Sequence, residues 1–424
     1  MSETESLKEY WRQRNRFYYD YVDFLVGFLV PAGRRVLKID NANLDFETLA
    51  GDYDYVVISD VLGHVADVEE FMRRVMGQLV PGGRVVITQY SALWEPILRL
   101  ASWFRLRSPV VEQNWLSPQD LNNFIYLAGL EKVRSGSKML LPKYVPFLSA
   151  FFNAIVVNLW PFSHLGLIHY LVARRPQAVS ANEKQPSLSI VVPARNEMGT
   201  IEKIARELPA LGAFTEVIFV EGNSTDGTLN EIKRVVAEVK TNTRLLWATQ
   251  EGRGKGDAVR KGFEMATGDI LTIYDADMTV PPEDVIKFYR ALVEGKGEFI
   301  NGSRLVYPME KESMRVLNFF GNKFFSLMFT WIIGQPVKDT LCGTKLLWRK
   351  DYEAIKNGRA FFGDFDPFGD FDLLFGATKL NLKILDIPVH YRERIYGATN
   401  ISRFSHGWLL LQMTFFAMRK LKFI

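Results

Sequence analysis

The chain has 424 residues, of which 48% are hydrophobic and 24% are charged, and its net charge is +4. This composition excludes a disordered chain, and the length exceeds what one ordinary core holds, so we expect two globular domains. The charge is small and spread over both halves, which predicts no nucleic acid among the partners. Cys342 is the only cysteine, so the chain has no internal disulfide and fits a reducing compartment.

Two apolar segments raise the question of membrane contact. Residues 144–173 carry no Lys, Arg, Asp or Glu, but prolines, asparagines and histidines interrupt them, so we expect no spanning helix there. Residues 408–424 are apolar and then basic, and they are too short to span a bilayer. This second segment either lies on an anionic membrane surface or packs as a helix whose basic end suits its dipole. The N-terminal residues are polar and charged, so we expect no signal peptide.

The first half alternates strands and helices. Apolar runs bounded by glycine or acidic residues predict strands, and one apolar stripe at helical spacing predicts a helix that Pro81-Gly82-Gly83 terminates before the next strand. This rhythm is typical of a doubly wound α/β domain, which we place at residues 1–176. The expected elements are a helix over 5–30, strands over 34–40, 52–60 and 84–90, and a helix over 66–79.

Residues 54–88 read DYVVISDVLGHVADVEEFMRRVMGQLVPGGRVVIT. They resemble the class I S-adenosylmethionine-dependent methyltransferases in their acidic strand end, their His-Val turn and the Pro-Gly-Gly before a strand. Residues 114–133 and 167–176 are also similar to that family. The resemblance implies a methyltransferase-like Rossmann domain in the first 176 residues.

One part of that pattern is missing. The family places a glycine-rich turn after the first strand, where the backbone approaches the cofactor. Here no glycine occurs between Gly33 and Gly51, and residues 41–43, Asn-Ala-Asn, each add a Cβ where close approach is needed. We therefore interpret the domain as one without methyltransferase activity, used for folding, dimerisation or docking, and His64 as a structural turn residue. The alternative is a bifunctional protein whose first half is an active methyltransferase.

The second half repeats a strand followed by a polar or acidic turn. We expect a linker over 177–187, which is polar and shows no apolar periodicity, and a second domain over 188–424. The repeated pattern indicates a nucleotide-binding half-sheet, in which ligands bind at the carboxyl ends of the strands. The expected strands are 188–192, the start of 215–228, 244–248 and 270–274.

Asp275 and Asp277 follow the last of these strands, one residue apart. If the strand continued, its alternation would point both carboxylates to the same side. Two hard oxygen ligands, followed by Pro281-Pro282 and a helix start, predict a seat for a divalent cation that binds a phosphate-bearing substrate. A solvated loop pair is the alternative for an isolated D-x-D.

Four motifs in order resemble those of the family 2 glycosyltransferases with a GT-A fold, in particular the branch similar to dolichyl-phosphate mannosyltransferases. They are V-V-P-x-x-N-E, E-G-N-S-T-D-G-T, G-K-G-x-A and D-A-D, and the resemblance covers residues 187–420. The family more often has Asp-Asp-Gly-Ser at the second motif, so the base of the nucleotide stays open. By resemblance, Pro193, Asn196 and Glu197 line the nucleoside pocket, Glu221 contacts the base or ribose, Lys255 approaches the diphosphate, and Asp275 and Asp277 hold Mg²⁺ or Mn²⁺.

Later segments would form the acceptor side of the site. Arg304 either faces a phosphate or caps the fold, and residues 317–336 are either a core helix or a surface for the lipid tail of an acceptor. A hydroxyl acceptor needs a carboxylate base, for which Asp370 and then Asp372 are the candidates. By resemblance, Asp339, Gly343 and Lys345 border the acceptor, Cys342 is a small buried filler, and Arg392 and Arg394 meet phosphate, Arg394 within the catalytic set.

Together these features predict a metal-dependent inverting hexosyltransferase that uses a nucleotide-sugar. Its acceptor is a polyprenyl phosphate, which is already ionised and needs no strong base, or a glycan hydroxyl. We expect a cytoplasmic enzyme, soluble or peripheral at the inner face of the plasma membrane, that works in cell-envelope polysaccharide synthesis. A non-catalytic scaffold is a further hypothesis, against which the intact D-A-D motif argues.

Overall fold

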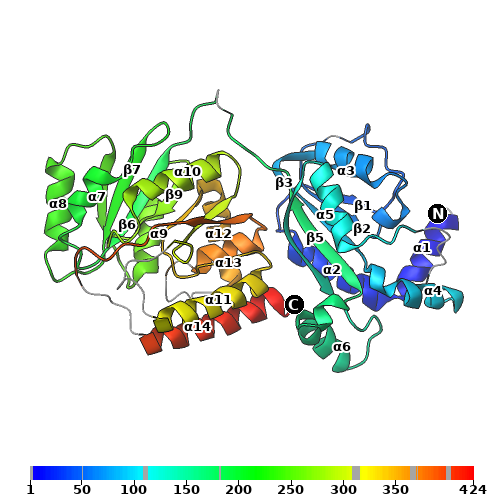
Figure 1. The fold of residues 1–424 in the computed structure, drawn as a ribbon. Helices are drawn as coiled ribbons and strands as arrows, with labels where there is room; N and C mark the ends of the chain where they lie inside the picture. Colours follow the sequence, from blue (N-terminus) through cyan, green and yellow to red (C-terminus); the bar gives the residue numbers. More distant parts are fainter. Residues whose placement is uncertain are drawn as a thin grey trace. The chain divides into compact units, whose positions relative to one another are not determined.

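The computed structural model describes residues 3–49, 51–107, 113–180, 183–307, 316–362, 369, 371–397 and 403–424. The chain divides into two compact units. The first comprises Met1–Gln177 with Lys422–Ile424, and the second comprises Ala178–Leu421. Each unit contains its own sheet with helices packed on it (Figure 1).

The first unit has a five-stranded sheet in the order β1-β2-β3-β5-β4. The first three strands are parallel, and β5 and β4 are each antiparallel to the neighbour before them in this order. Alternate side chains of β2 enter two different cores, because Val56 and Ile58 pack with α3 and α5 whereas Tyr55 and Val57 pack with α2. The elements are α1 (Glu3–Arg14), α2 (Arg16–Leu29), β1 (Val36–Ile39), β2 (Tyr53–Ser59), α3 (Val68–Gly77), β3 (Leu79–Tyr90), α4 (Glu95–Trp103), α5 (Pro118–Leu127), β4 (Glu131–Lys138) and β5 (Ile168–Arg174).

Two predicted elements of this unit differ in the structure. The single helix predicted over 5–30 is two helices, interrupted at Asn15, whose side chain bonds the carbonyl of Trp11 instead of continuing the helix. Pro81-Gly82-Gly83 does not precede its strand but lies inside β3, which begins at Leu79. The pairing with β2 shifts register at this point, and Gly82 takes a φ of 78°, so the tripeptide forms a bulge in the strand.

The apolar segment between β4 and β5 is not one long helix. It contains α6 (Leu148–Ala150), a π-helical turn at Phe151–Ile155, and 3₁₀ turns at Val156–Asn158 and Phe162–His164. Across the parts of the chain that the structure describes, no helix combines the length and the apolar character needed to cross a bilayer.

The second unit has a seven-stranded sheet in the order β12-β10-β11-β9-β6-β7-β8. Strands β9, β6, β7 and β8 are parallel, as their continuous apolar runs predict, and β11 is antiparallel to both of its neighbours. The strands are β6 (Leu188–Ala194), β7 (Thr215–Glu221), β8 (Arg244–Thr249), β9 (Ile270–Ile273), β10 (Phe299–Ser303), β11 (Lys345–Trp348) and β12 (Ile384–Pro388).

Helices cover both faces of this second sheet (Figure 1). Ile190 and Val192 of β6 belong to the core formed with α7, α8 and α10, whereas Val191 between them contacts Gly262 of α9 on the opposite face. The helices are α7 (Ile201–Glu207), α8 (Thr228–Glu238), α9 (Lys255–Met265), α10 (Val285–Val293), α11 (Val316–Ile333), α12 (Arg349–Gly358), α13 (Phe371–Lys379) and α14 (Arg403–Ala417).

Candidate active site

The predicted donor-site residues lie where the second sheet reverses its winding. The chain runs from β6 to β7 and β8 on one side, and then places β9 on the other side of β6. The carboxyl ends of β6 and β9 therefore border the switch point at which open α/β sheets bind ligands. Residues 193–197 leave β6 at this point, and Asp275 and Asp277 follow β9.

Asp275 is paired with a lysine. Strand β9 ends at Ile273 and the chain turns at 276–277, so the continued extension that would align the two carboxylates does not occur. Lys255 Nζ, at the start of α9, lies 2.5 Å from Asp275 Oδ1. Burial alone would raise the pKa of Asp275, but the ammonium of Lys255 outweighs it and holds that pKa below its usual value.

Asp277 is paired with an arginine from the other end of the domain. Arg394 Nη2 lies 3.2 Å from Asp277 Oδ2, and its Nη1 lies 2.7 Å from Glu197 Oε1. Thr279 fixes the second oxygen of Asp277 by donating from its backbone N–H and its hydroxyl. Arg394 thus joins the loop after β6 to the turn after β9.

Glu197 is the least satisfied carboxylate in this group. Its side chain is 6% exposed, and its Oε2 is buried without a hydrogen-bond partner. Burial raises the pKa of Glu197 to about 7, with Asp277 adding to the rise and Arg394 opposing it. A carboxylate with an orphaned oxygen beside a guanidinium is suited to accept a ligand hydroxyl.

Gly343 lies directly against the Asp275–Lys255 pair. A Cβ at this position would stand 2.1 Å from Asp275 Oδ2 and 2.3 Å from Lys255 Nζ. Only glycine leaves room there, so the loop before β11 approaches the same carboxylate that was predicted to hold a metal. Gly343 was predicted at the acceptor side and here also borders the donor side.

The first two motifs are bonded to each other. Asn196, at a φ of 56°, accepts a hydrogen bond from the backbone of Thr225, and Glu221 accepts one from the backbone of Ser224. Asp226 accepts from the backbone of Met198. Together with Pro193, which is half-buried near the end of β6, these residues lie at the carboxyl end of the sheet.

Arg304 and Asp339 form a buried ion pair. Arg304 Nε and Nη2 lie 2.6 and 2.9 Å from the two oxygens of Asp339, which also accepts from Asn322. Burial would raise the pKa of Asp339, yet the guanidinium lowers it to about 2. In the ligand-free chain Arg304 thus has a structural partner, and Asp339, which was predicted to border the acceptor, is fully buried.

The other residues predicted on the acceptor side differ in burial and in their partners. Lys345 is buried and its Nζ donates to the carbonyl of Cys342, whose thiol is also buried, with a pKa raised by burial to about 11. Asp372 is bound by Arg359 at 3.1 Å. Arg392 is exposed and pairs with Glu283, while Asp370, together with Asp364 and Asp366, lies outside the described residues.

Two contacts were not found from the sequence. Thr279 orients Asp277, and the ring of Tyr396 lies against Gly199, where a Cβ would meet it at 2.4 Å. Thr279 sits two residues after its aspartate, a common spacing for a polar side chain that bonds a local carboxylate, so that contact has a sequence signal. The Tyr396 contact joins positions almost 200 residues apart and has none.

The donor atoms at this site suit a hard divalent cation. Asp275 and Asp277 offer carboxylate oxygens at a strand end, beside cations that a diphosphate can also engage. No cluster of three or more His, Cys, Asp or Glu side chains with ligand geometry occurs in the described ranges. Asp275 and Asp277 therefore fit Mg²⁺ or Mn²⁺ completed by water and substrate oxygens.

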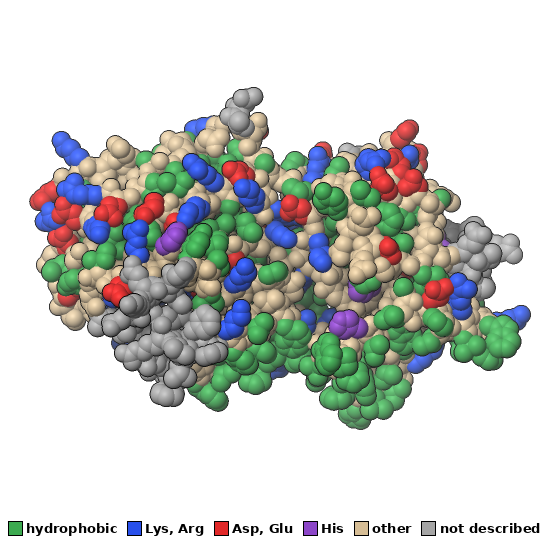
Figure 2. Space-filling view, in the orientation of Figure 1, with side chains coloured by type: hydrophobic (Ala, Val, Ile, Leu, Met, Phe, Trp, Pro, Cys, Tyr) green, Lys and Arg blue, Asp and Glu red, His purple; other side chains and the backbone are tan. Residues whose placement is uncertain are grey.

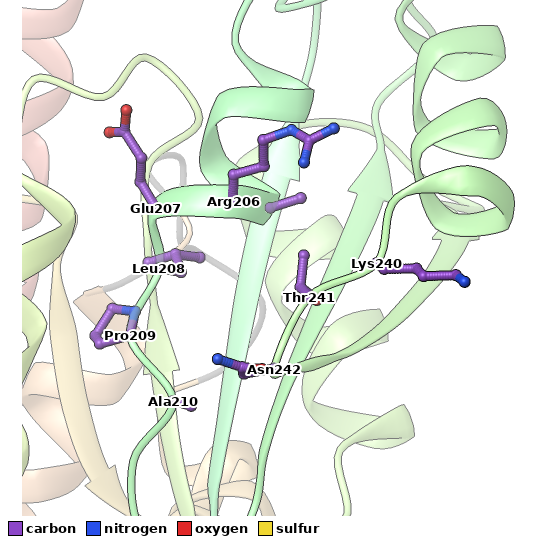
Figure 3. Close-up of a pocket in the computed structure, with 9 residues that line it drawn as sticks. Arg206, Glu207, Leu208, Pro209, Ala210, Lys240, Thr241 and Asn242 are labelled. Atoms are coloured by element: carbon purple, nitrogen blue, oxygen red, sulfur yellow. The ribbon is translucent and has the colours of Figure 1, made fainter.

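A pocket in the second unit lies away from this site (Figure 3). It is lined by Leu208, Pro209 and Ala210 before β7 and by Thr241 and Asn242 before β8. These loops lie at the amino ends of the strands, opposite to the carboxyl ends where Asp275 follows β9. The charged ends of the flanking side chains point away from the space between the loops (Figure 3), so the pocket presents no converging catalytic groups.

The first unit lacks the features of a nucleotide-binding turn. No helix follows β1 among residues 40–49 and 51–52, so no helix N-terminus is available at this strand end for an anion. β1 is also an edge strand, which leaves no switch-point crevice beside it. His64 lies in a 3₁₀ turn, Leu62–His64, with its backbone N–H bonded to Val61.

Comparison with protein families agrees with the two units. The model for glycosyl transferase family 2 matches residues 189–355, and the model for a methyltransferase domain matches residues 22–135. Both resemblances predicted from motifs, and the α/β fold class of the two domains, are confirmed.

Curated relatives match about half of the chain or less. The low-salt glycan biosynthesis hexosyltransferase Agl6 of Haloferax volcanii is 27% identical over 231 residues, which cover 53% of this chain and 52% of that protein. The dolichol-phosphate mannosyltransferase of Saccharomyces cerevisiae is 38% identical over 109 residues, covering 24% of this chain and 40% of the yeast protein. The chain thus spans about half or less of the length of these two relatives.

Among solved structures, glucosyl-3-phosphoglycerate synthase from Mycobacterium tuberculosis, in complex with Mn²⁺, UDP and glucosyl-3-phosphoglycerate, is 19% identical. The alignment covers 56% of this chain and 80% of that one, with a TM-score of 0.41. The mannosyltransferase PcManGT from Pyrobaculum calidifontis, in complex with GDP-Man and Mn²⁺, is 21% identical over 55% and 62% of the two chains, with a TM-score of 0.37. On its family matches and motifs, the chain is similar to glycosyltransferase family 2 in its second unit and to a methyltransferase domain in its first.

Proposed function

We propose that the second unit is a metal-dependent inverting hexosyltransferase that moves a sugar from a nucleotide-sugar to a polyprenyl phosphate. The observation that carries this proposal is the pairing of each D-x-D carboxylate with its own cation, Asp275 with Lys255 and Asp277 with Arg394, at the switch point of the sheet. Charges of both signs are held at the place where a nucleoside diphosphate binds in this fold class.

In this proposal Asp275 and Asp277 would hold the metal, which would act as a Lewis acid toward the charge that develops on the leaving nucleoside diphosphate. Lys255 and Arg394 exchange their carboxylate partners for diphosphate oxygens, and Glu197 accepts a hydroxyl of the donor through its unbonded oxygen. The bond between the anomeric carbon and the diphosphate oxygen breaks as an acceptor oxygen attacks from the opposite face. The leaving group takes the electron pair.

A phosphate acceptor is supported by two observations. Of the two candidate bases, Asp370 lies outside the described residues and Asp372 is 11% exposed and bound by Arg359, whereas a phosphate acceptor needs neither. Helices α11 and α14 pack together and expose large apolar side chains toward solvent, a surface suited to a lipid tail and to the inner face of a membrane. These side chains are Phe324, Leu327, Trp408 and Phe415, which are 50 to 68% exposed.

The test uses the full chain with Mn²⁺, labelled GDP- and UDP-hexoses, and either polyprenyl phosphate or a soluble glycan as acceptor. We expect one donor to transfer to the lipid phosphate, and chelation of the metal to stop the reaction. Asp275→Asn and Asp277→Asn should each lower kcat by at least about a thousandfold without unfolding the protein. Glu294→Gln, which removes only an exposed partner of Lys296, is the matched control and should keep full activity.

Wild-type turnover in either aspartate variant would refute the metal assignment. Transfer to the glycan alone would refute the lipid-phosphate acceptor while leaving the donor site intact. Thermal stabilisation by GDP or UDP that requires Mn²⁺ tests the donor site independently of any acceptor.

A further inference from the structure

The first unit exposes a large apolar surface made of two segments. We define the apolar face as residues 93–106 and 144–165. Phe147 is 92% exposed, Trp160 81% and Trp103 77%, and further aromatic and aliphatic side chains between them are about half exposed. In Figure 2, hydrophobic side chains gather on the side of this unit that carries α6. Contiguous apolar surface of this kind marks an interaction site.

The polarity of residues 144–165 is inverted relative to an ordinary surface loop. Ser149, Asn153 and Asn158 are 2 to 4% exposed, while the aromatic residues around them face solvent. Asn153 accepts from the backbone N–H groups of Leu140 and Leu141 and donates to the carbonyl of Leu141. The buried amide side chains thus make hydrogen bonds with the backbone of the segment. The segment is therefore folded with its apolar side chains on the solvent side.

Phe147 is held outward by a strained turn. Its φ of 61° and ψ of −45°, closed by a bond from the N–H of Leu148 to the carbonyl of Pro146, describe a γ-turn that residues with a Cβ rarely adopt. Ser149 braces the turn by accepting from the N–H of Val145 and donating to the carbonyl of Lys143. Backbone strain of this kind persists where surrounding bonds impose it, commonly at functional positions.

The two segments form one surface. Trp94 Nε1 donates to the carbonyl of Leu165 at 2.8 Å. Asn15 accepts from Lys143 Nζ at 3.0 Å and donates to the carbonyl of Leu106. Bonds at both ends therefore tie residues 93–106 to residues 144–165.

Most charges in the two segments and their flanks are positive. Residues 93–107 and 138–165 contain four cations that reach the surface, Arg99, Arg105, Arg107 and Lys143, and a single acid, Glu95, whereas Lys138 is buried. Glu95 is bound by Arg99 at 2.6 Å. Exposed Trp, Tyr and Phe side chains above a basic rim are the pattern of a surface that enters the interfacial layer of an anionic bilayer.

We propose that the apolar face docks the first unit on an anionic phospholipid surface, so that the methyltransferase-like domain serves as a membrane anchor. A protein partner would require regularly spaced hydrogen-bonding groups, about one bond per 100–200 Å². Here Ser149, Asn153 and Asn158 are turned inward and bonded to backbone, which leaves Ser163 and His164 as polar side chains at the surface of residues 144–165. The inference rests on the first unit alone and does not depend on the donor or acceptor of the second.

The direct test places a fluorescent label on this face. Cys342 is buried and its pKa is raised by burial to about 11, so a cysteine introduced by Phe147→Cys is the reactive thiol of the full-length protein. With an environment-sensitive dye at position 147, we expect a blue shift on adding vesicles of phosphatidylglycerol and phosphatidylcholine, and quenching by acyl-chain quenchers. Tyr126→Cys is the control, because Tyr126 is 78% exposed on α5, which packs on the other face of the sheet. A label at position 147 that stays in water while the protein binds vesicles would overturn the proposal.

Sedimentation with the same vesicles measures the contribution to binding. We expect the double variant Phe147→Ser, Trp160→Ser to bind at least about tenfold more weakly than wild type and than Tyr126→Ser. If that double variant does not fold, Trp103→Ser, at the end of α4, gives the same comparison. Vesicle binding of the variant equal to that of wild type overturns the proposal. A variant that loses dimer formation but keeps vesicle binding overturns it too, because the face would then bind a second copy of the chain.

Discussion

Replacing Gly343 with alanine is expected to disable the donor site with little effect on the fold. The added Cβ would lie 2.1 Å from Asp275 Oδ2, and an ordinary contact begins near 3.4 Å, so the carboxylate must move by about 1.3 Å. A displacement of about 1 Å in a reacting constellation commonly costs about a hundredfold in rate. Gly343 has no positive φ, so alanine meets no backbone strain, and the atoms it displaces are the ends of side chains.

In Gly343→Ala we therefore expect kcat/KM for transfer, and the affinity for a nucleoside diphosphate with Mn²⁺, to fall by about a hundredfold. The free energy of unfolding should fall by no more than about 1–3 kcal/mol. Calorimetric titration and thermal unfolding measure the two quantities. Gly358→Ala is the matched control, because a Cβ at Gly358 meets nothing within 4 Å. Affinity and kcat/KM within about threefold of wild type would refute the placement of Gly343 against a working Asp275.

Three further predictions concern stability and the first unit. Burial raises the pKa of Asp60 to about 6. The folded protein therefore loses stability as pH rises from about 4 through 6, because the folded state must ionise this buried carboxyl. Asp60→Asn should accordingly raise the melting temperature near pH 7, by the equivalent of at most about 3 kcal/mol, and leave it unchanged near pH 4; an equal effect at both pH values would contradict this. Asp339→Asn strands the buried guanidinium of Arg304 and should cost about 3–5 kcal/mol in urea unfolding, whereas Glu283→Gln, which loses only an exposed pair, should cost less than about 1 kcal/mol. S-adenosylhomocysteine should not shift the melting temperature, and micromolar binding by calorimetry would show that the first unit is a working methyltransferase after all.

The sheet of the second unit was largely predictable from the sequence. Continuous apolar runs such as 188–192 lie in parallel strands because both faces of the sheet are covered, and the glycines and acids that end them mark the ligand edge. The D-x-D motif predicted a site at this same edge of the sheet, after β9. The family match then agreed with the order of four motifs along one stretch of chain.

The partners of the site residues were less predictable. The sequence left open whether Arg304 binds a ligand or forms a structural ion pair. Its partner Asp339 lies 35 residues away, and only the folded chain shows the two in contact. Arg394 contacts Glu197 and Asp277 over greater separations, 197 and 117 residues along the chain. In the first unit, Pro81-Gly82-Gly83 was misread as a boundary because a bulge uses the same residues as a turn.

The paired carboxylates have a consequence for how ligands bind. If Asp275 and Asp277 hold the metal as proposed, Lys255 and Arg394 are internal counter-ions that compete with it for the same two carboxylates. A bare metal offers these two side chains nothing in return, whereas a nucleoside diphosphate offers them new anionic partners. The affinities for metal and nucleotide are then thermodynamically linked, and each ligand strengthens the other by the same factor. The ion pairs of the ligand-free site would thus favour uptake of the metal and the nucleotide together over uptake of either alone.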